Sequence, residues 1–590
     1  MKLYKITLAL ILGVGTLASC NDKLELTNPN QQTTGSFGYT DSDLEECVIA
    51  AYNHTRMEGS YARVGYTIDV CRGDEVWNSS QVWYMPFDDL NDAVDAGDEP
   101  IGEWSWREWF YTLNVCNFIL SRTGEDDDSG LTTTTSRIKG QALFLRGLCY
   151  YNLTGYYQNP PIITDYNSYS TLDGLYCKNY QETAGEDPNI QYDAALDLCE
   201  SDFKRAMSLL PSKNEGGEWA SGRANSGAAA GYYARTLMVR HKYSEALAVL
   251  KDIINGTYGT YKLMANYGDN FREGSPYENN DESLYEVQFL DKDQQGTDDE
   301  WTPVNTSAYA TQGSAVESNY APGNMGGWAD LSASPWLYNL FKAERTTSGS
   351  LDPRLYWTIG TYEPEWEGYE FGNVAYTQAM SESTPVVTNN NYGGLPIAKW
   401  THFRTGEYES VVTGLHDGIN LRLMRYSDVL LRAAECENEV NGVTDQAIEW
   451  INQVRRRAEL ADLKKADFAS KDALFEQIAN VERPKEFGCE FGRGLDLIRW
   501  GFFYSSDRRQ QLLEHGAFNI CLDNTVKDPV DVTDCYKSTY QQYQDGHEFL
   551  PIYQWLLNNN ANLTGNSANN SKSNSSYFTS NGWTVHPVVK

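Results

Sequence analysis

Apolar residues recur every three or four positions along several long stretches of the chain, which is the spacing of one face of an α-helix. Four such stretches stand out, at residues 43–57, 106–120, 136–157 and 192–210. Trp106 and Trp109 fall on the apolar face of the second stretch, so we expect them to be core residues. The last two stretches run into prolines, which cannot continue a helix. The pattern therefore predicts long amphipathic helices at all four places.

Two further segments have the pattern of helix pairs. Residues 225–255 carry small residues in their first half and a join near His241, and a similar pair recurs at 420–458. The spacing of Ala234 and Ala246 resembles that of a tetratricopeptide hairpin, in which a small residue on one helix admits a large one from the other. Because such hairpins bury their apolar faces only by stacking, several should pack in series.

We therefore predict a mainly α-helical fold, with about four tetratricopeptide-like hairpins over residues 43–256 and 420–460. Between 260 and 420 the helical period is lost, and Gly, Asn, Ser, Thr and aromatic residues dominate. We expect a loop-rich insertion with short strands there, and loops of this length are usually functional or disordered. Its aromatic content argues against disorder. The Asn- and Ser-rich residues from 561 onward are expected to lie irregularly on the surface.

The first 19 residues have the composition of a secretory signal. Lys2 and Lys5 precede a short apolar core that ends in small residues, and the run is too short to span a bilayer. Residues 17–20, Leu-Ala-Ser-Cys, resemble a bacterial lipobox, which implies that Cys20 is acylated and becomes the N-terminus of residues 20–590. An ordinary signal followed by a chance cysteine is the alternative. If Cys20 is acylated, we expect the lipid to be the membrane anchor.

Charge narrows the range of partners. The chain has 81 acidic and 47 basic residues and a net charge of −34. Nucleic acid and anionic membrane surfaces would be repelled, so we expect neither as a partner. The balance favours a neutral or cationic ligand, or serves solubility alone.

Cysteine and histidine patterns do not indicate a cofactor or metal. The 11 cysteines lack the spacing of a zinc site, and the seven histidines are scattered. Cys116, Cys149 and Cys199 lie among apolar residues at helical spacing, where buried thiols are expected. Cys521 and Cys535, in a polar segment, are the one plausible disulfide.

Three sequence blocks, at 139–163, 422–440 and 482–501, resemble signature segments of the SusD/RagB family of surface lipoproteins. A fourth, at 549–566, is similar to the closing motif of that family, although Tyr553 stands where a proline is common. The order of the blocks, the lipobox and the tetratricopeptide-like pairs agree with this resemblance.

The resemblance implies that residues 20–590 form a single SusD-like domain whose C-terminal motifs span 482–566. It also implies a lipid-anchored protein of the outer membrane, facing the cell exterior, that captures oligo- or polysaccharide. Such a protein sits as a lid on a SusC-like TonB-dependent β-barrel transporter. Charged residues in the shared blocks also have a structural explanation, since buried charges are tolerated mainly when paired. We expect the following to be paired scaffold groups rather than sugar ligands: Arg146, Arg425, Glu435 and Arg499.

A neutral oligosaccharide offers apolar faces that pack on aromatic rings and hydroxyls that bind planar polar groups. Residues 71–92 combine both kinds of side chain, and the SusD-like family builds part of its ligand face from this region. The candidates are Arg72, Asp74, Trp77, Asn78, Trp83 and Tyr84. A second candidate segment, 301–336, contributes Trp301 and Trp328, whereas Trp336 begins an amphipathic pattern and is expected in the core. Since tryptophans are mostly buried, each of these rings could equally be a core residue, and Asp74 could cap a turn.

The rival class is a surface glycoside hydrolase. The chain has no G-x-S-x-G, GxxxxGK[ST] or HExxH motif. A hydrolase would need a pair of carboxylates across a cleft, which 81 acidic residues can neither supply nor exclude. We expect a non-catalytic binding protein. A peptide-binding tetratricopeptide scaffold and a lid for peptide import are further alternatives.

Overall fold

The computed structural model describes residues 37–78, 84, 87, 101–167, 188–290, 313–321, 326–360, 363–366, 370–371, 374–375, 395–402, 414–516, 519–520, 530–531, 543–560, 562–563 and 575–589. The predictions made for Cys20, Trp83, Trp301, Cys521 and Cys535 lie outside these residues. Within them, no helix is both long enough and apolar enough to cross a membrane.

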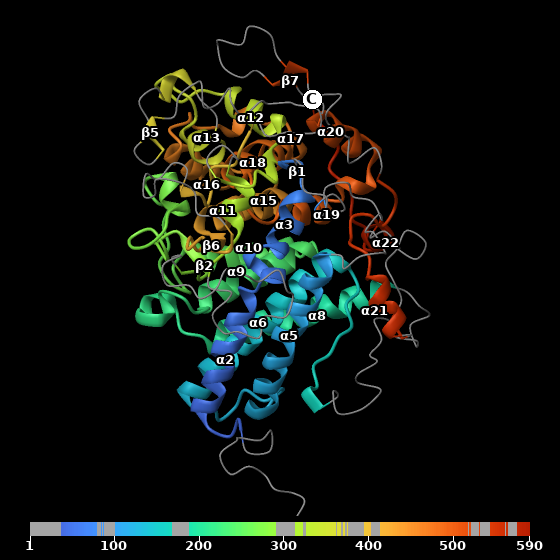
Figure 1. Cartoon of the computed structure of the whole chain (residues 1–590). Coiled ribbons are helices and arrows are strands. Elements are labelled where there is room, and N and C mark those ends of the chain that lie inside the picture. Colours follow the sequence, from blue (N-terminus) through green and yellow to red (C-terminus); the bar gives the residue numbers. More distant parts are fainter. Residues whose placement is uncertain are drawn as a thin grey trace, which may run out of the picture.

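A series of stacked helices forms the scaffold, as the hydrophobic pattern predicts. Each helix packs against the next one in the following order: α2 (Asp41–Thr55), α5 (Ile101–Thr123), α6 (Thr133–Tyr157), α8 (Pro188–Leu209), α9 (Ser226–Val239), α10 (Tyr243–Ile254), α15 (Tyr426–Asn441) and α16 (Asp445–Arg457). Figure 1 shows α2, α5, α6 and α8 in the lower half of the molecule, below the elements of the later chain. Because α10 packs on α15, the long insertion between them does not interrupt the stack.

Side-chain caps and small residues explain where these helices begin and how closely they pack. Thr40, Thr132, Asn225 and Thr444 each accept a backbone N–H bond at the N-terminus of a helix. On α9, a Cβ at Gly231 would collide with the side chain of Met424. The absence of a side chain at Gly231 therefore lets Met424, in the strand formed by residues 421–425, pack directly against α9, which also packs against helix α10.

The insertion contains short strands, as expected, and short helices besides. β1 (Val76–Asn78) pairs with β3 (Leu331–Ala333), and β2 (Ser283–Val287) pairs with β6 (Leu421–Arg425), both antiparallel. A smaller ribbon joins β4 (Glu370–Phe371) to β5 (Val374–Ala375) within the insertion, and another, after it in the chain, joins β7 (Asn519–Ile520) to β8 (Val530–Asp531). The short helices are α11 (Val316–Tyr320), α12 (Pro335–Lys342) and α13 (Pro353–Thr358).

The second predicted helix pair differs at its start. Residues 421–425 form strand β6, with all five side chains buried, and the helix begins only at Tyr426. A run that is buried on both faces has no helical period to distinguish it from the helix that follows.

The C-terminal quarter adds short helices that pack around the scaffold. They are α17 (Lys471–Gln477), a π-helical turn η12 (Ile478–Glu482), α18 (Arg483–Phe487), α19 (Arg493–Arg499), α20 (Ser506–Gly516), α21 (Gln554–Asn559) and α22 (Ser575–Ser580). An N-terminal π-helical turn, η1 (Glu58–Ala62), precedes α3 (Val64–Cys71).

The end of the chain follows the expectation only in part. Residues 575–580 form a short helix that packs on the scaffold, whereas residues 581–589 are irregular and exposed or half-buried, as expected. Tyr577 and Phe578 are buried, and the ring of Trp583 stacks on His241 with centroids 3.9 Å apart and planes at 7°. The aromatic rings within the polar segment provide apolar surface for this contact.

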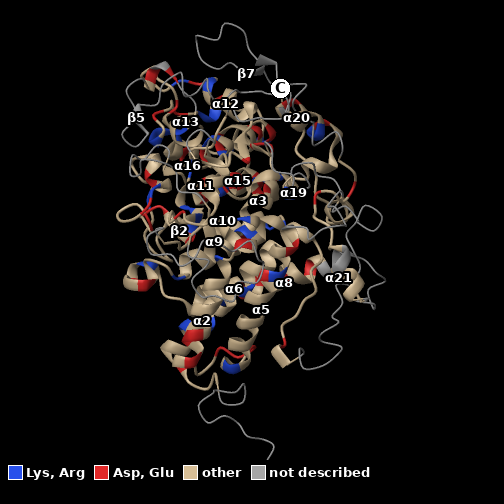
Figure 2. Cartoon of the chain, in the orientation of Figure 1, with Lys and Arg blue, Asp and Glu red and all other residues tan. Residues whose placement is uncertain are grey.

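Core residues are placed as the sequence predicts. Trp106 and Trp109 are buried, and Cys116, Cys149 and Cys199 are buried free thiols. The charged residues of the shared blocks are paired: Arg146 with Asp202 and Glu125, and Arg499 with Glu435 and Asp496. Acidic and basic residues are interleaved over the described elements in Figure 2.

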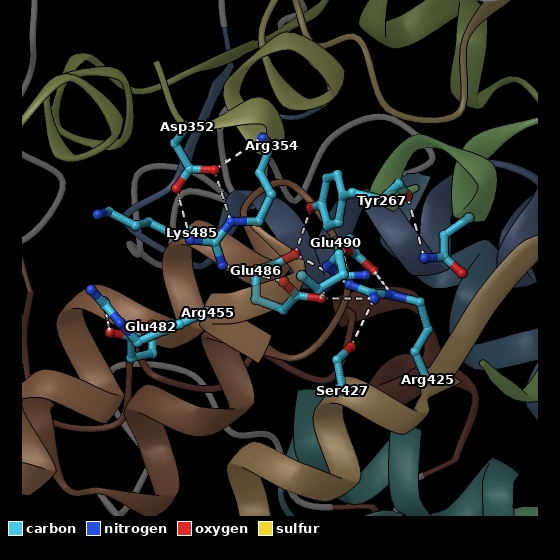
Figure 3. A network of polar contacts seen from close by, with 12 residues as sticks. Tyr267, Asp352, Arg354, Arg425, Ser427, Arg455, Glu482, Lys485, Glu486 and Glu490 are labelled. Atoms are coloured by element: carbon cyan, nitrogen blue, oxygen red, sulfur yellow. Dashed lines mark hydrogen bonds and ion pairs between the residues drawn. The ribbon is translucent and has the colours of Figure 1, made fainter. Parts of the chain in front are cut away.

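The largest of these pairings is a buried ion cluster around Arg425 (Figure 3). Arg425 Nη1 lies 2.5 Å from Glu282 Oε1 and 3.0 Å from Glu486 Oε1, and its Nη2 lies 2.7 Å from Glu490 Oε1. Glu486 also pairs with Arg354 and Arg457. Burial alone would raise the pKa of Glu486, but the three arginines outweigh it and hold that pKa below the ordinary value. The expectation that Arg425 is a scaffold group is confirmed.

Replacing Glu486 by Gln should leave buried guanidinium groups without their counter-charge and lower the free energy of unfolding by about 3–5 kcal/mol. Urea unfolding measures the loss. A matched control is Glu449→Gln, which breaks an exposed pair with Arg456 and should cost less than about 1 kcal/mol. Equal losses in the two variants would contradict this account. Because the pKa of Glu486 is lowered in the folded protein, its contribution is complete at neutral pH and is lost as the pH falls through that lowered pKa.

Candidate ligand-binding site

The two segments that the sequence analysis selected for sugar binding meet in the β1–β3 ribbon. Trp77 lies opposite Ser332, and Asn78 lies opposite Leu331. One further backbone hydrogen bond extends the ribbon: the Ser334 N–H donates to the Glu75 carbonyl oxygen at 2.8 Å. Residues that are far apart in the sequence are therefore held side by side.

Asp74 anchors the start of the first segment. Arg493 donates from Nε and Nη2 to its two carboxylate oxygens, at 2.6 and 2.8 Å, and His515 Nδ1 lies 2.7 Å from Oδ2. Burial alone would raise the pKa of Asp74, but Arg493 and His515 outweigh it and hold that pKa below the ordinary value. The His515 ring stacks on buried Trp336, with centroids 3.9 Å apart. The expectation that Trp336 is a core residue is confirmed.

Arg63 connects Tyr84 of the first segment to Trp328 of the second. Its Nε donates to the Tyr84 hydroxyl at 2.7 Å, and its guanidinium carbon lies 5.2 Å from the centroid of the Trp328 ring. Glu58 balances the charge, 3.0 Å from Arg63 Nη1. The arrangement holds the Trp328 ring against a cation, a contact that is attractive because the ring face carries negative charge.

Most of the predicted ligand contacts are buried. Those of the first segment within the described residues expose at most 7% of their surface: Arg72, Asp74, Trp77, Asn78 and Tyr84. Arg72 donates to the carbonyl of His547. Direct contact of these side chains with a ligand therefore finds no support in this geometry, and they hold the ribbon in place. Trp328 is half-buried.

The residues that sequence reasoning missed are the partners of the predicted ones. Arg493 and His515 follow Asp74 by several hundred positions, and Arg63 lies in a helical region. Arg493 falls within the 482–501 block that resembles a family signature. The block therefore pointed to this part of the sequence, but it did not indicate that Arg493 contacts Asp74.

Two further buried carboxyl groups are those of Glu75, directly before β1, and Asp69, in α3. Burial raises the pKa of Glu75 to about 8 and that of Asp69 to about 7. Burial thus favours the neutral form of Glu75 although Arg493 lies 3.8 Å away, whereas Asp74 is ionised and paired. A glycosidase needs two carboxyl groups facing a substrate. The described part of the ribbon places Asp74 and Glu75 in the interior, with 1% and 3% of their surface exposed.

A group with potential metal ligands lies elsewhere, at Glu317, His402 and Asp417. His402 Nδ1 lies 2.8 Å from Glu317 and Nε2 lies 3.0 Å from Glu273. Burial would lower the pKa of His402, but these carboxylates outweigh it and raise that pKa to about 10. The residues therefore form a buried ion network, and the ligand atoms of Glu317, His402 and Asp417, all within 4.8 Å of one another, are also close enough to hold a metal ion.

Family comparisons match both halves of the chain. Residues 281–569 match the family described as the SusD family, and residues 23–238 match one described as starch-binding associating with outer membrane. Two similar proteins of Formosa agariphila are SusD-like protein P25, 25% identical over 85% of this chain and 90% of the relative, and SusD-like protein P2, 24% identical over 85% and 91%.

Solved structures share the fold. A SusD homolog from Bacteroides thetaiotaomicron has a TM-score of 0.68 and 18% identity, covering 91% of this chain and 98% of that one. Surface glycan-binding protein A from the same species, in complex with laminarihexaose, has a TM-score of 0.60 and 19% identity, covering 89% and 99%.

The burial of Trp77 yields a test. Replacing it by Ala should remove about 3–5 kcal/mol of stability, because a large buried ring leaves a cavity. Trp328→Ala, at the half-buried ring, should cost less. Thermal and urea unfolding of both variants measures this. A Trp77 variant as stable as the wild type would contradict its place in the core.

Proposed function

The chain belongs to the SusD family, and from this premise we propose that it is a surface glycan-binding lipoprotein that captures oligo- or polysaccharide without cleaving it. The observation that carries the proposal is the β1–β3 ribbon, which joins two aromatic and polar segments on a helical scaffold. A protein of similar fold in complex with laminarihexaose supports a glycan as the class of ligand.

We place the ligand contact at Trp328. Its half-buried ring can offer a flat apolar face to a sugar, and Arg63 and Tyr84 hold it in position. Trp83 and Trp301 remain predicted contacts from the same two segments. The buried residues beneath, among them Asp74 and Arg493, fix the ribbon on which the site is built.

We further propose that the chain delivers its ligand to a SusC-like TonB-dependent transporter and acts as its lid. The family resemblance supports this proposal. Affinity-tagged full-length chain, extracted from outer membranes in mild detergent, should then co-purify with a TonB-dependent barrel protein. Recovery of the chain without such a barrel would count against the lid role.

The purified full chain should bind a glycan reversibly and release no shorter product. Trp328→Ala should weaken that binding several-fold, because a stacked aromatic contact contributes about 0.5–1.5 kcal/mol beyond area burial. A glycan array identifies the ligand, and titration calorimetry with product chromatography measures both quantities. Tyr39→Ala removes an exposed ring outside the ribbon and is the control. Steady release of shorter sugars would favour the hydrolase alternative.

Lipid anchoring has its own test. Because acylation requires the cysteine sulfur, Cys20→Ala should lose the label when cells are fed an alkynyl fatty acid. Protease treatment of intact cells then reports whether the wild-type chain faces the exterior. Equal label in the wild type and the variant would rule out Cys20 as the acylated residue.

A further inference from the structure

A pocket of about 320 Å³ opens on another part of the scaffold. Its walls come from α2, from the loop at 218–223 and from β2 with the residues that follow it. None of its lining residues belongs to the β1–β3 ribbon. The volume is at the lower end of the range for ligand sites, roughly 300–1,000 Å³, which suits one or two sugar rings more than a long chain.

The pocket is lined by both apolar and hydrogen-bonding groups. Tyr285 is buried in its wall, and Ile49 exposes 55% of its surface at the rim. Gln288 is held in place by Asn279 and Asn420, which both donate to its Oε1 at 2.9 Å. Apolar surface beside fixed planar polar groups is the combination that a pyranose ring requires.

Arg56 is the unusual residue of this pocket. Its Nε and Nη2 donate to Asn53 Oδ1 at 3.0 and 2.8 Å, and no carboxylate among the described residues contacts it. Several arginines of the interior, such as Arg63, Arg146 and Arg493, pair with carboxylates. Burial lowers the pKa of Arg56 without a counter-charge to offset it. The Nη1 edge of its guanidinium finds no acceptor in the described chain.

Nearby carboxylates do not neutralise this cation, because they are committed elsewhere. Glu218 lies 2.9 Å from Arg223 Nε, and Glu286 lies 3.2 Å from Arg422 Nε. More distant acidic residues are screened, since the Debye length is about 8 Å at physiological salt. The acidity of the whole chain therefore does not prevent an anion from binding beside Arg56.

We propose that this pocket is a second saccharide subsite, selective for a sugar that bears a carboxylate, and that Arg56 binds the carboxylate. A planar carboxylate matches the guanidinium fork, and such charge-assisted bonds are stronger than bonds to a hydroxyl. Asn53 fixes the opposite edge of the guanidinium and is a positioning residue. The inference rests on the proposed function only in taking the ligand to be a saccharide.

The test is titration calorimetry of the full chain with trigalacturonate and, as the neutral counterpart, maltotriose. Trigalacturonate should bind more tightly, and its affinity should fall about tenfold or more in Arg56→Gln. Asn53→Asp supplies an internal carboxylate to Arg56 and should reduce the affinity to a similar extent. Lys204→Gln removes an exposed positive charge elsewhere on the scaffold and should leave the affinity unchanged. Unfolding curves establish that all variants are folded.

Three results would overturn the proposal: no binding of trigalacturonate, equal affinity for the neutral sugar, or unchanged affinity in both the Arg56 and the Asn53 variants. The outcome is separable from that of the ribbon site. Trp328→Ala should leave trigalacturonate binding intact while weakening the glycan found on the array. Loss of trigalacturonate binding in Trp328→Ala alone would place the acidic sugar at the ribbon and also overturn the proposal.

Discussion

The ion cluster around Arg425 is the constraint on which the rest of the structure depends. Arg425, at the end of β6, meets Glu282 just before β2, Glu486 in α18 and Glu490 in the turn between α18 and α19. Removing one partner from such a cluster leaves an uncompensated buried charge. The strand pair, the end of the insertion and the C-terminal segment must therefore assemble together, since each carries part of the charge balance.

The position of the β1–β3 ribbon is tied to this cluster through the segment 490–493. Glu490 belongs to the cluster, and Arg493, three residues later, begins α19 and holds Asp74. Helix α19, whose Arg493 anchors Asp74 before β1, therefore begins directly after the last residue of the ion cluster, Glu490. A bidentate arginine bond fixes both distance and orientation, so the ribbon is held by the same segment that completes the core.

Arginine has two contrasting uses in this molecule. In the interior it pairs with carboxylates, which keeps charges in the core at an acceptable cost because each guanidinium satisfies several acceptors in a fixed geometry. At the pocket beside α2, Arg56 has an amide partner instead. The first arrangement neutralises the charge within the chain, whereas the second pairs the guanidinium of Arg56 with a neutral amide oxygen.

The sequence by itself determined the helical scaffold and the pairing of its charged residues. A period of three to four residues marks a buried helix face wherever one face meets solvent, so α2, α5, α6, α8, α9 and α10 were predictable, as was the burial of Arg146 and Arg425. The same rule could not distinguish β6 from α15, because side chains buried on all sides carry no period. Only the tertiary structure decided that Trp77 and Tyr84 are core residues and that Trp328 is not. An aromatic residue beside an acidic one gives the same sequence pattern whether the two side chains face a ligand or a distant arginine. Two contacts distinguish these cases here: Asp74 with Arg493, and Arg63 with Trp328. Both join residues that lie far apart in the sequence and meet only in the folded chain.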